Sequence, residues 1–564
     1  MGHKAVPEPP VLSSGWRRLG RKLPASLKGA LRRQADNLLP NRETREYRAW
    51  IAERLKHRAL VYNEPLEPGL LSVLTPVWDG SPLPYLKRLA SALIAQNQSG
   101  ACEWALLDNG CTDTRLLSFL DGLRSHCWIQ RYRLDTNIGI TRGLRYCLEH
   151  ARGRYVMPVD ADDLLYPDTL RIVTSYIRRF NYPPLLYSDE DKIIGTKVYQ
   201  PYMKPDWDPV LLLNSAYIAH LGVLDRQKAL DLGAYSDVNT EGSPDWDVFV
   251  RFLIAAHPAA HIPEVLYSWR VHAHSTADDA ATKPYVHASQ RAVLQRFLDA
   301  RSGNGKFDIE YNPLLGGMAH WHFSREHSQS SSFTQAIVRG DEKPDRALTE
   351  LAKSAAQRDG FVHLIGDDVQ IDDPSWPDEA LSIFELHPDA VMIGGRIRNR
   401  SGVITEAGRH FGFAGPCGCP NHGRPVTDPG YFGQMWKQRS VSAVSAQFAV
   451  VRASFLYELL QQIPASASLA FLGAWAGALA LRSGKRVVYS PFLSGVSDRD
   501  WDTLVDPAEQ ALFARTNHDI IPDCRFYSRN LSLEKPFAFG NPEISRNESC
   551  GAGRSSCTGA GTPV

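Results

Sequence analysis

From Leu70 onward, short apolar runs of strand length alternate with longer segments of helical spacing. Leu70 to Thr75 is an apolar run closed by Pro76, and Leu83 to Gln96 places apolar residues on one helical face. The alternation continues with predicted strands at Glu103–Leu107, Ile129–Arg133 and Tyr155–Val159 and predicted helices at Asp113–Leu123 and Ile140–His150. Strands separated by short helices predict an α/β fold with a mostly parallel sheet and helices on both faces.

Polar residues follow the carboxyl ends of three of these predicted strands. Thr75 to Asp79 follows the first strand, Asp108-Asn-Gly110 the second and Asp160-Ala-Asp162 the fourth. Ligands of parallel sheets bind beyond the carboxyl ends of the strands, so we expect these clusters to meet at one edge. No Gly-x-Gly-x-x-Gly follows the first strand and no Walker Gly-Lys-Ser occurs, which disfavours dinucleotide and P-loop chemistry.

The acidic run Asp160-Ala-Asp162-Asp163 is the most informative of these clusters. Carboxylates this close repel one another near a core unless a cation neutralises them. Asp160 and Asp162, separated by one small residue, can meet a hard divalent ion through oxygen ligands. Taken alone, the run is more often an acidic turn that caps the next helix. The other motifs along the chain favour the metal site.

Three later motifs add ionisable and aromatic side chains. Tyr187-Ser-Asp-Glu-Asp-Lys192 is a second acidic cluster that follows a short apolar run. Asp245 stands just before a helical pattern, where an aspartate is more often an N-cap than a catalytic group. Trp269-Arg-Val-His272 brings together an aromatic ring, a cation and a histidine, although such a histidine alone is more often an ordinary residue than a ligand.

Together these residues resemble the family 2 glycosyltransferases, an inverting family with the GT-A nucleotide-diphospho-sugar fold. The resemblance runs from about Leu70 to Ala300 and is similar to the bacterial enzymes that build O-antigen, rhamnan and other surface polysaccharides. Its most specific parts are Asn137-Ile-Gly139, Ala151-Arg-Gly153-Arg-Tyr155 and Asp160-Ala-Asp162-Asp163. The set is completed by Tyr187-Ser-Asp-Glu-Asp-Lys192, Pro-Asp245-Trp-Asp247 and Trp269-Arg-Val-His272. The chain departs from the family where Asp108-Asn-Gly-Cys111 replaces Asp-Asp-Gly-Ser and where Leu144-Arg145 replaces Arg-Asn.

The resemblance implies a reaction and a role for each matching residue. It implies hexosyl or rhamnosyl transfer with inversion from a UDP- or dTDP-sugar to a hydroxyl of a glycan or lipid-linked glycan, with Mn²⁺ or Mg²⁺ as cofactor. Asp162 and His272 are then the metal ligands and Asp245 is the general base. The implied nucleotide-sugar contacts are Thr75, Pro76, Asp79, Asp108, Asn137, Gly139, Asp160 and Ala161. The implied acceptor or sugar contacts are Asp189, Glu190, Asp191, Trp246, Asp247, Trp269 and Arg270.

The remaining segments divide the chain around this transferase domain, expected over residues 70–300. Residues 1–69 predict a basic helical extension in which arginines and lysines alternate with Trp16 and several leucines. This extension either lies on an anionic membrane surface or is a solvated helix docked on the next domain. Residues 301–345, rich in Gly, Ser and His, predict a linker, and residues 541–564 predict a disordered tail.

A second, weaker resemblance to the same family begins near Arg346. Phe361 to Asp368 looks like the strand and its acidic motif, but the segment before Arg346 offers no counterpart of the first strands. Ala470 to Gly477 has no carboxylate where the family places its base. We therefore expect a truncated α/β domain over 346–540 that is a degenerate, inactive copy. A shortened but active second transferase is the open alternative.

Composition bears on partners and location. The 63 Lys and Arg nearly balance the 62 Asp and Glu, so the net charge of +1 makes no case for nucleic acid binding. Nine scattered cysteines fit a reducing compartment, and no apolar leader or membrane-spanning run is visible. We therefore expect a cytoplasmic protein, with peripheral contact to the inner membrane if the basic extension binds lipid. Cys417-Gly-Cys419 with His422 lacks the second pair that a structural zinc site needs.

Two other functions compete with sugar transfer. A nucleotidyltransferase uses a similar sheet and acidic motif, but it has no need of a base at Asp245 or a ligand at His272. A largely non-catalytic glycan-binding or scaffold protein suits the C-terminal half, but not residues 70–300, where every position that carries chemistry is filled.

Overall fold

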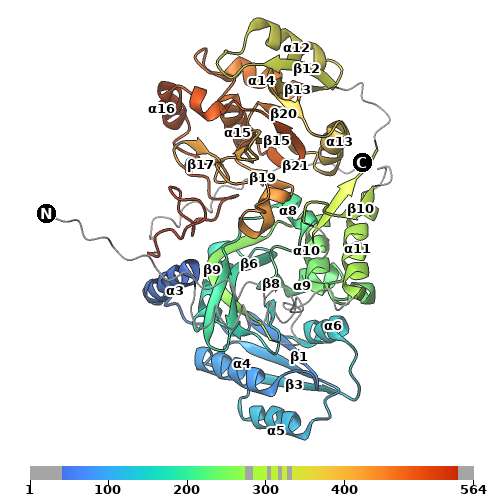
Figure 1. Ribbon diagram of the computed structural model, residues 1–564. Coiled ribbons are helices and arrows are strands. Elements are labelled where there is room, and N and C mark those ends of the chain that lie inside the picture. Colours follow the sequence, from blue (N-terminus) through green and yellow to red (C-terminus); the bar gives the residue numbers. More distant parts are fainter. Residues whose placement is uncertain (1–40, 273–283, 302–306, 316–319, 327–332, 544–564) are drawn as a thin grey trace, which may run out of the picture.

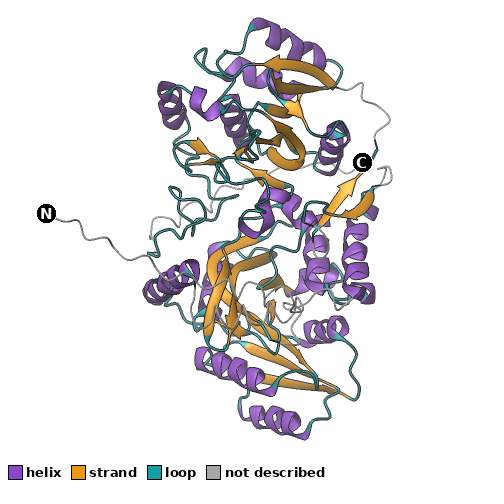
Figure 2. Cartoon of the chain, viewed as in Figure 1, coloured by secondary structure: helices purple, strands orange, loops and turns teal. Residues whose placement is uncertain are grey.

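Two β-sheets with flanking helices form the two halves of the molecule (Figures 1 and 2). The structure is a computed structural model that describes residues 41–272, 284–301, 307–315, 320–326 and 333–543. We call the part built on the N-terminal sheet the first domain and the part built on the C-terminal sheet the second domain. The α/β class expected from the sequence, with a second sheet-rich domain, is confirmed.

The first sheet has the strand order β3-β2-β1-β4-β8-β6-β9-β5, with β7 paired to β6. Its first four strands are parallel, and Val77 at the end of β1 lies beside Asp108 on β2. The strands are β1 (Leu71–Val77), β2 (Glu103–Asn109), β3 (Ile129–Leu134), β4 (Tyr155–Pro158), β5 (Leu164–Leu165), β6 (Leu185–Ile194), β7 (Lys197–Tyr202), β8 (Gly222–Asp225) and β9 (Ala260–Arg270). The carboxyl ends of β1, β2 and β4 therefore share one edge.

Helices cover both faces of this sheet because successive strand residues point to opposite sides. Val73 and Met157 pack with α4 (Leu83–Gln96), α5 (Thr114–Gly122) and α7 (Thr169–Arg179). Leu74 and Val156 pack on the other face with α6 (Ile140–His150), α10 (Pro244–Ile254) and α11 (Pro284–Asp299). The short helices α8 (Pro209–Asn214) and α9 (Arg226–Asp231) complete this side. Two apolar cores thus hold the sheet from both sides.

Within the described residues, the second sheet repeats the strand order of the first but lacks the two strands at one edge, β3 and β2. Its order β12-β13-β20-β15-β21-β14 matches β1-β4-β8-β6-β9-β5, and each neighbouring pair has the same relative direction. The strands are β12 (Phe333–Val338), β13 (Phe361–Gly366), β14 (Gln370–Ile371), β15 (Ala390–Arg398), β20 (Phe448–Arg452) and β21 (Arg486–Val496), with β16 (Ile404–Glu406) and β19 (Arg439–Val441) at the side. Within the described residues, β2 and β3 have no counterpart in this sheet.

The helices of the second domain also follow the chain order of the first. They are α12 (Arg346–Ala356), α13 (Trp376–Leu386), α14 (Ala453–Gln462), α15 (Leu472–Arg482) and α16 (Pro507–Thr516). Just as α10 precedes β9, α15 precedes β21. A separate two-stranded ribbon, β17 (His410–Phe411) and β18 (Cys417–Gly418), lies between β16 and β19 in the sequence.

The linker expected at residues 301–345 is wrong for three short segments. β10 (Asp308–Tyr311) and β11 (Trp321–Ser324) form an antiparallel pair, and Trp321 packs into a core of the first domain. β12 is the edge strand of the second sheet, so one early strand does have a counterpart before Arg346. These strands have only four to six residues, and the surrounding Gly, Ser and His hide their pattern in the sequence.

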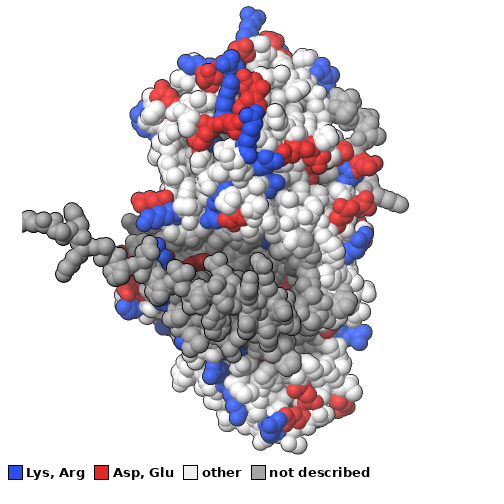
Figure 3. Space-filling view, in the orientation of Figure 1, with Lys and Arg blue, Asp and Glu red and all other residues white. Residues whose placement is uncertain are grey.

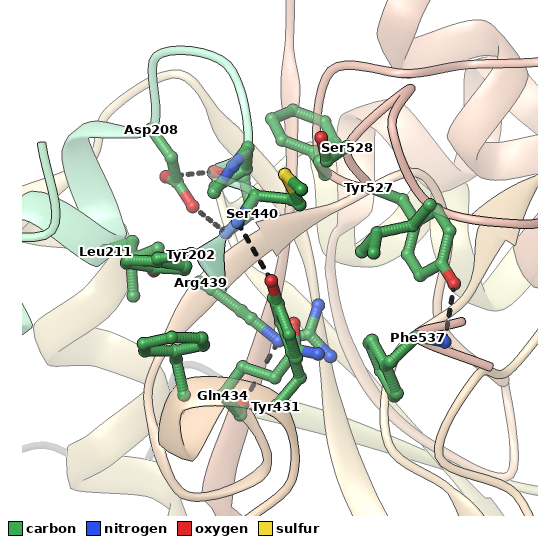
Figure 4. A pocket seen from close by; sticks show the side chains of 15 residues that line it. Tyr202, Asp208, Leu211, Tyr431, Gln434, Arg439, Ser440, Tyr527, Ser528 and Phe537 are labelled. Carbon is green, nitrogen blue, oxygen red and sulfur yellow. Dashed lines mark hydrogen bonds between the residues drawn. The ribbon is translucent and has the colours of Figure 1, made fainter. Parts of the chain in front are cut away.

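The two domains share an interface with buried hydrogen bonds. The carboxylate of Asp208, the N-cap of α8, accepts from the backbone N–H of Ser440 at 2.8 Å and from its hydroxyl at 2.7 Å. Figure 4 shows the adjoining cavity of about 20 Å³, where Tyr202 and Asp208 face Tyr431, Arg439 and Ser440. A cavity of this size holds about one water molecule.

Helix α3 (Arg42–Val61) lies within the helical extension expected over residues 1–69 and docks on the first domain. Buried Arg54 forms a two-point ion pair with Glu264 at 2.8 and 3.0 Å, and buried Arg58 pairs with Asp168. The hydroxyl of Tyr47 donates to Asp191 at 2.5 Å. Residues 42–61 are therefore part of the fold, whereas the basic residues before position 41 and the tail after 543 lie outside the described residues. No helix in the described ranges is both long enough and apolar enough to span a bilayer.

The Asp191 carboxyl gives this docking a pH dependence. Burial raises its pKa to about 7, against the lowering effect of hydrogen bonds that include those from Tyr166 and Tyr47. The folded protein therefore holds a proton that the unfolded chain releases, so the free energy of unfolding falls as pH rises from about 4 to about 7. One such group changes it by at most about 1.4 kcal/mol per pH unit.

Replacing Asp191 with Asn should remove this dependence, because the amide keeps an oxygen acceptor for the tyrosines and does not ionise. We expect the melting temperature of Asp191→Asn, relative to wild type, to rise steadily between pH 4 and pH 7. The exposed Asp231→Asn serves as the control and should track wild type. A difference that stays constant across this range would show that Asp191 is ionised throughout.

Candidate functional site

The acidic loop after β4 lies beside the end of β9. β5 pairs with β9 through Leu164 and Ser268, which brings the loop next to the residues that follow Arg270. The Oδ2 atom of Asp162 lies 2.7 Å from Nε2 of His272. Oxygen atoms of Asp160, Asp162 and Asp163 lie within 4.8 Å of one another. The two residues expected to be metal ligands are therefore adjacent, with Asp160 beside them.

Asp163 and Arg270 fix the shape of this loop. The buried carboxylate of Asp163 accepts from the hydroxyl of Tyr267 and, at 2.7 Å, from the backbone N–H of Arg270. The guanidinium of Arg270 donates to the backbone carbonyl of Asp162 at 2.6 Å. Both oxygens of Asp163 thus have protein partners that fix the loop. Arg270, expected to touch sugar or acceptor, is buried and bonded to this loop.

The donor set fits a hard divalent cation. Burial, together with the nearby charges of Asp162 and Asp245, raises the pKa of Asp160 to about 6 against an opposing effect of His220. Carboxylates this close to one another repel, and a cation bound between them would relieve the repulsion. Carboxylate oxygens with open positions for further oxygen ligands suit Mg²⁺ or Mn²⁺, and an imidazole lies within reach.

Asp245 lies at the start of α10 but is not its N-cap. The N-cap position belongs to Ser243, and Asp245 is the second residue of the helix. Its two oxygens lie 3.5 Å from the hydroxyl of Tyr235 and 3.7 Å from Nε2 of His220. Burial raises the pKa of Asp245, while the charge of His220 and the Tyr235 hydroxyl act in the opposite direction. Its carboxylate is thus directed to the site and not to the helix backbone.

His220 connects the acidic groups of the site and was missed by the sequence analysis. Its backbone N–H donates to Glu190 at 2.6 Å, and its ring lies 3.8 Å from the same carboxylate oxygen. The ring stacks on Tyr267, with centroids 5.0 Å apart. Burial disfavours its charge, but Glu190, Asp160 and Asp245 outweigh this and raise its pKa to about 10. A single imidazolium therefore faces three carboxylates.

The residues expected to contact the nucleotide lie at the same edge of the sheet. The hydroxyl of Thr75 accepts from the indole N–H of Trp104 at 3.0 Å, and Pro76 follows it within β1. Asp79 accepts from the backbone N–H groups of Thr112 and Asp113 and so fixes the loop after β2. Ala161 is buried within the acidic loop. Several of these groups thus shape the edge through bonds to the protein.

Asp108 and Asn137 are also held by the protein. Burial opposes the ionisation of Asp108, but hydrogen bonds from Arg131 and the Cys111 backbone lower its pKa. The side-chain oxygen of Asn137 accepts from Asn109 at 3.0 Å and from the backbone N–H of Gly139 at 2.9 Å. The carboxylate of Glu241, which the sequence did not indicate, accepts from the first two backbone N–H groups of α6.

Four residues expected to touch the acceptor are instead buried and bound by protein groups. Asp189 pairs with His261 at 2.8 Å, and Asp191 accepts from two tyrosines. The indole of Trp246 donates to Leu212, and Asp247 pairs with Arg251 and Arg296. Because these four side chains are buried and bound by protein groups, their contact with an acceptor stays a prediction. Glu190 and the partly buried Trp269 remain beside His220.

Comparison with known proteins places this region in a family. A family model described as Glycosyl transferase family 2 matches residues 72–191, from β1 through most of β6, and so includes the acidic loop. The chain is 27% identical over 443 residues to the Uncharacterized protein y4gI of Sinorhizobium fredii, which covers 68% of this chain and 48% of that protein.

A second relative carries a functional name. The O-antigen biosynthesis protein RfbC of Myxococcus xanthus is 25% identical over 428 residues, which covers 66% of this chain and 33% of that protein. The chain thus spans about half the length of these two relatives or less. Among solved structures, S. aureus TarS 1-349 in complex with UDP-GlcNAc aligns with a TM-score of 0.32 and 16% identity, over 41% of this chain and 72% of that one.

The matched residues are those that form the parallel strands and the acidic loop of the first domain. The chain therefore contains a glycosyltransferase domain of family 2, with residues 72–191 as its matched core.

Proposed function

We propose that the first domain transfers a sugar from a nucleoside-diphosphate donor to a hydroxyl of a glycan or lipid-linked glycan, with inversion at the anomeric carbon. The family of residues 72–191 supports sugar transfer, and the relative named for O-antigen biosynthesis supports a surface polysaccharide as the product. The observation that carries the proposal has two parts: Asp160 lies beside Asp162, which contacts His272, and Asp160 and Asp245 both interact with the ring of His220.

The donor half of the proposed site is the edge formed by β1, β2 and β4. Thr75, Pro76, Asp79, Asp108, Asn137 and Gly139 line the subsite for the base and ribose of a UDP- or dTDP-sugar. Asp162 and His272 would hold a divalent cation, and Asp160 and Ala161 would support the ribose and the cation. When bound, the cation neutralises the charge that develops on the departing diphosphate. Asp163 and Arg270 keep the loop in the shape that this arrangement needs.

The acceptor half is the face that carries Asp245. A sugar hydroxyl is a weak nucleophile, so a carboxylate within hydrogen-bond reach must take its proton as it attacks. Asp245 can act in this way only when ionised, and the positive charge of His220 favours that form. Glu190 in turn holds His220 in place through the backbone bond at 2.6 Å. Attack from the side opposite the leaving diphosphate inverts the anomeric centre without a covalent enzyme intermediate.

For the second domain we propose a degenerate transferase copy that does not turn over donor. It lacks counterparts of β2 and β3 within the described residues, and these strands frame the base subsite of the first domain. Asp367 pairs with Arg499 at 2.7 Å, and one oxygen of Asp368 accepts from Ser497 at 2.6 Å, so protein groups contact both carboxylates of this acidic motif. The start of α15 carries no carboxylate where α10 carries Asp245.

Donor turnover should need a divalent cation held by Asp162. We expect nucleoside diphosphate release from a UDP- or dTDP-sugar to require Mn²⁺ or Mg²⁺ and to fall to background in Asp162→Ala. The matched control is Asp367→Ala in the second domain, which should keep wild-type turnover. Full turnover in excess chelator, or in Asp162→Ala, would contradict the metal site.

Asp245→Asn separates catalysis from structure. Asn keeps the shape of the side chain but has no lone pair that takes a proton at neutral pH. We expect a melting temperature near wild type, unchanged binding of UDP with Mn²⁺, and a transfer rate lower by about 10²–10⁴. Asp378→Asn, also just after a proline in the first turn of a helix, is the control and should keep its activity. A transfer rate near wild type would mean that the base lies elsewhere.

His220→Gln tests whether His220 positions and ionises Asp245. Removing the imidazolium should raise the pKa of Asp245, so the acid limb of the pH–rate profile should move to higher pH. We expect kcat to fall by about tenfold, which corresponds to a loss of about 1.4 kcal/mol, with a smaller change in KM for the donor.

Glu190→Gln should shift the pH–rate profile in the same direction, and the effects of the two substitutions should not add. The exposed His518→Gln is the control. An unshifted profile would leave His220 with a packing role only.

A further inference from the structure

A cavity of about 370 Å³ opens in the second domain beside the start of α15. The proposed reaction does not use it. Its wall comes from the β17–β18 ribbon, the start of α15, the segment after β21, α16 and the C-terminal segment. The lining residues that the argument uses are Arg409, Phe413, Phe471, Asp502, Gln510 and Glu534. Pockets that bind small ligands typically measure roughly 300–1,000 Å³, so this one has room for a ligand.

The matched strand orders show where this cavity lies relative to the first domain. Phe471 is the N-cap of α15, and α15 corresponds to α10, which carries Asp245. Asp502 lies in the segment that follows β21 (Arg486–Val496). The cavity therefore adjoins the start of the helix that corresponds to the one carrying Asp245, the residue of the acceptor half. Within the described residues the second sheet has no counterparts of β2 and β3, while this cavity stays open.

The charges of the wall exclude an anionic ligand. Arg409 is buried and already contacts two carboxylates, Glu406 at 2.6 Å and Asp502 at 2.5 Å. The carboxylate of Glu534 also lies in the wall. A phosphate or a nucleoside diphosphate would thus meet carboxylates and a guanidinium that is already neutralised. Around this domain, the face visible in Figure 3 mixes both signs of charge and presents no broad positive patch.

The same wall does not suit a metal ion either. His422, Asp500 and Asp502 have ligand atoms within 4.8 Å of one another, but Asp502 is already paired with the buried guanidinium of Arg409. A cation bound there would compete with that guanidinium. Burial raises the pKa of Cys419 to about 12, so its thiol stays protonated and is a poor zinc ligand.

With anions and metal ions excluded, neutral sugar units are the ligand class that suits the wall of this cavity. Each sugar hydroxyl both donates and accepts, and the wall offers donors on Gln510 and His422 with acceptors on Asp502, Glu534 and Gln510. Phe413 and Phe471, which are 4% and 2% exposed, form a small apolar part of the wall that C–H groups of a pyranose ring can contact. We propose that this cavity binds one or two neutral sugar units of the acceptor glycan and does not transfer to them. This inference rests on the proposed function, from which it takes the class of ligand.

Saturation-transfer NMR on the full chain tests the proposal. The probes are methyl glycosides of D-glucose, D-galactose, N-acetyl-D-glucosamine and L-rhamnose, measured without donor and in the presence of EDTA. Gln510→Trp fills the cavity from the partly exposed face of α16, and Glu534→Ala removes an acceptor at an exposed position. The matched control, Gln462→Trp, places the same indole on the exposed end of α14.

We expect at least one glycoside to bind wild type, Gln462→Trp and Asp245→Asn alike. Binding should weaken by about tenfold or more in Gln510→Trp, which is about 1.4 kcal/mol, and should also weaken in Glu534→Ala. Gln510→Trp should release nucleoside diphosphate from donor as fast as wild type. If the wild-type chain binds glycosides in a way that depends on Gln510 but does not turn over donor, that result would count against the proposed function alone.

Three results would overturn the sugar site. One is that no glycoside binds the folded chain. Another is that binding is the same in Gln510→Trp, Glu534→Ala and wild type. The third is that Gln510→Trp abolishes binding of UDP rather than of glycosides, which would make the cavity a nucleotide site.

Discussion

The pairing of β5 with β9 is the constraint on which the candidate site depends. Two residues of β5 bond to β9 in antiparallel register, and this contact carries the acidic loop to the residue that follows the end of β9 by two positions. Asp163, held by Tyr267 and by the backbone of Arg270, locks the loop in place. This strand pair brings Asp162 to within 2.7 Å of His272, although the two residues are 110 positions apart in the sequence.

The electrostatics of the site follow from that geometry. Asp160 and Asp245 lie in a desolvated region, and both have a raised pKa. His220 compensates part of this negative charge, and Glu190 holds its backbone in position. A divalent cation at Asp162 would compensate the remaining negative charge. The stability of the acidic loop would then be linked to the binding of a diphosphate. The buried ion pairs of α3 with Glu264 and Asp168 support β9 and the start of α7 from behind.

The sequence predicts those parts of the site whose signal is local. The apolar run Tyr155–Val159 followed by carboxylates fixed both the fourth strand and its acidic loop. The sequence could not indicate that Asp189 and Asp191 are buried, because a cluster of acidic residues does not show which face of a strand each residue occupies. His220 carried no local signal, since its role depends on Glu190, Asp160 and Asp245 from three separate elements. β12 was hidden by its short length, although its partner β13 was visible in Phe361–Gly366.

The two domains share one strand order, but within the described residues only the first sheet has strands β2 and β3. The central claim is that one nucleotide site, on the first sheet, serves the whole chain. Calorimetric titration of the full chain with UDP in the presence of Mn²⁺ tests it most directly. The account predicts one site per chain, absent in Asp162→Ala and unchanged in the double variant Asp367→Ala with Asp368→Ala. A stoichiometry of two, or a single site that survives in Asp162→Ala and disappears in the double variant, would contradict it.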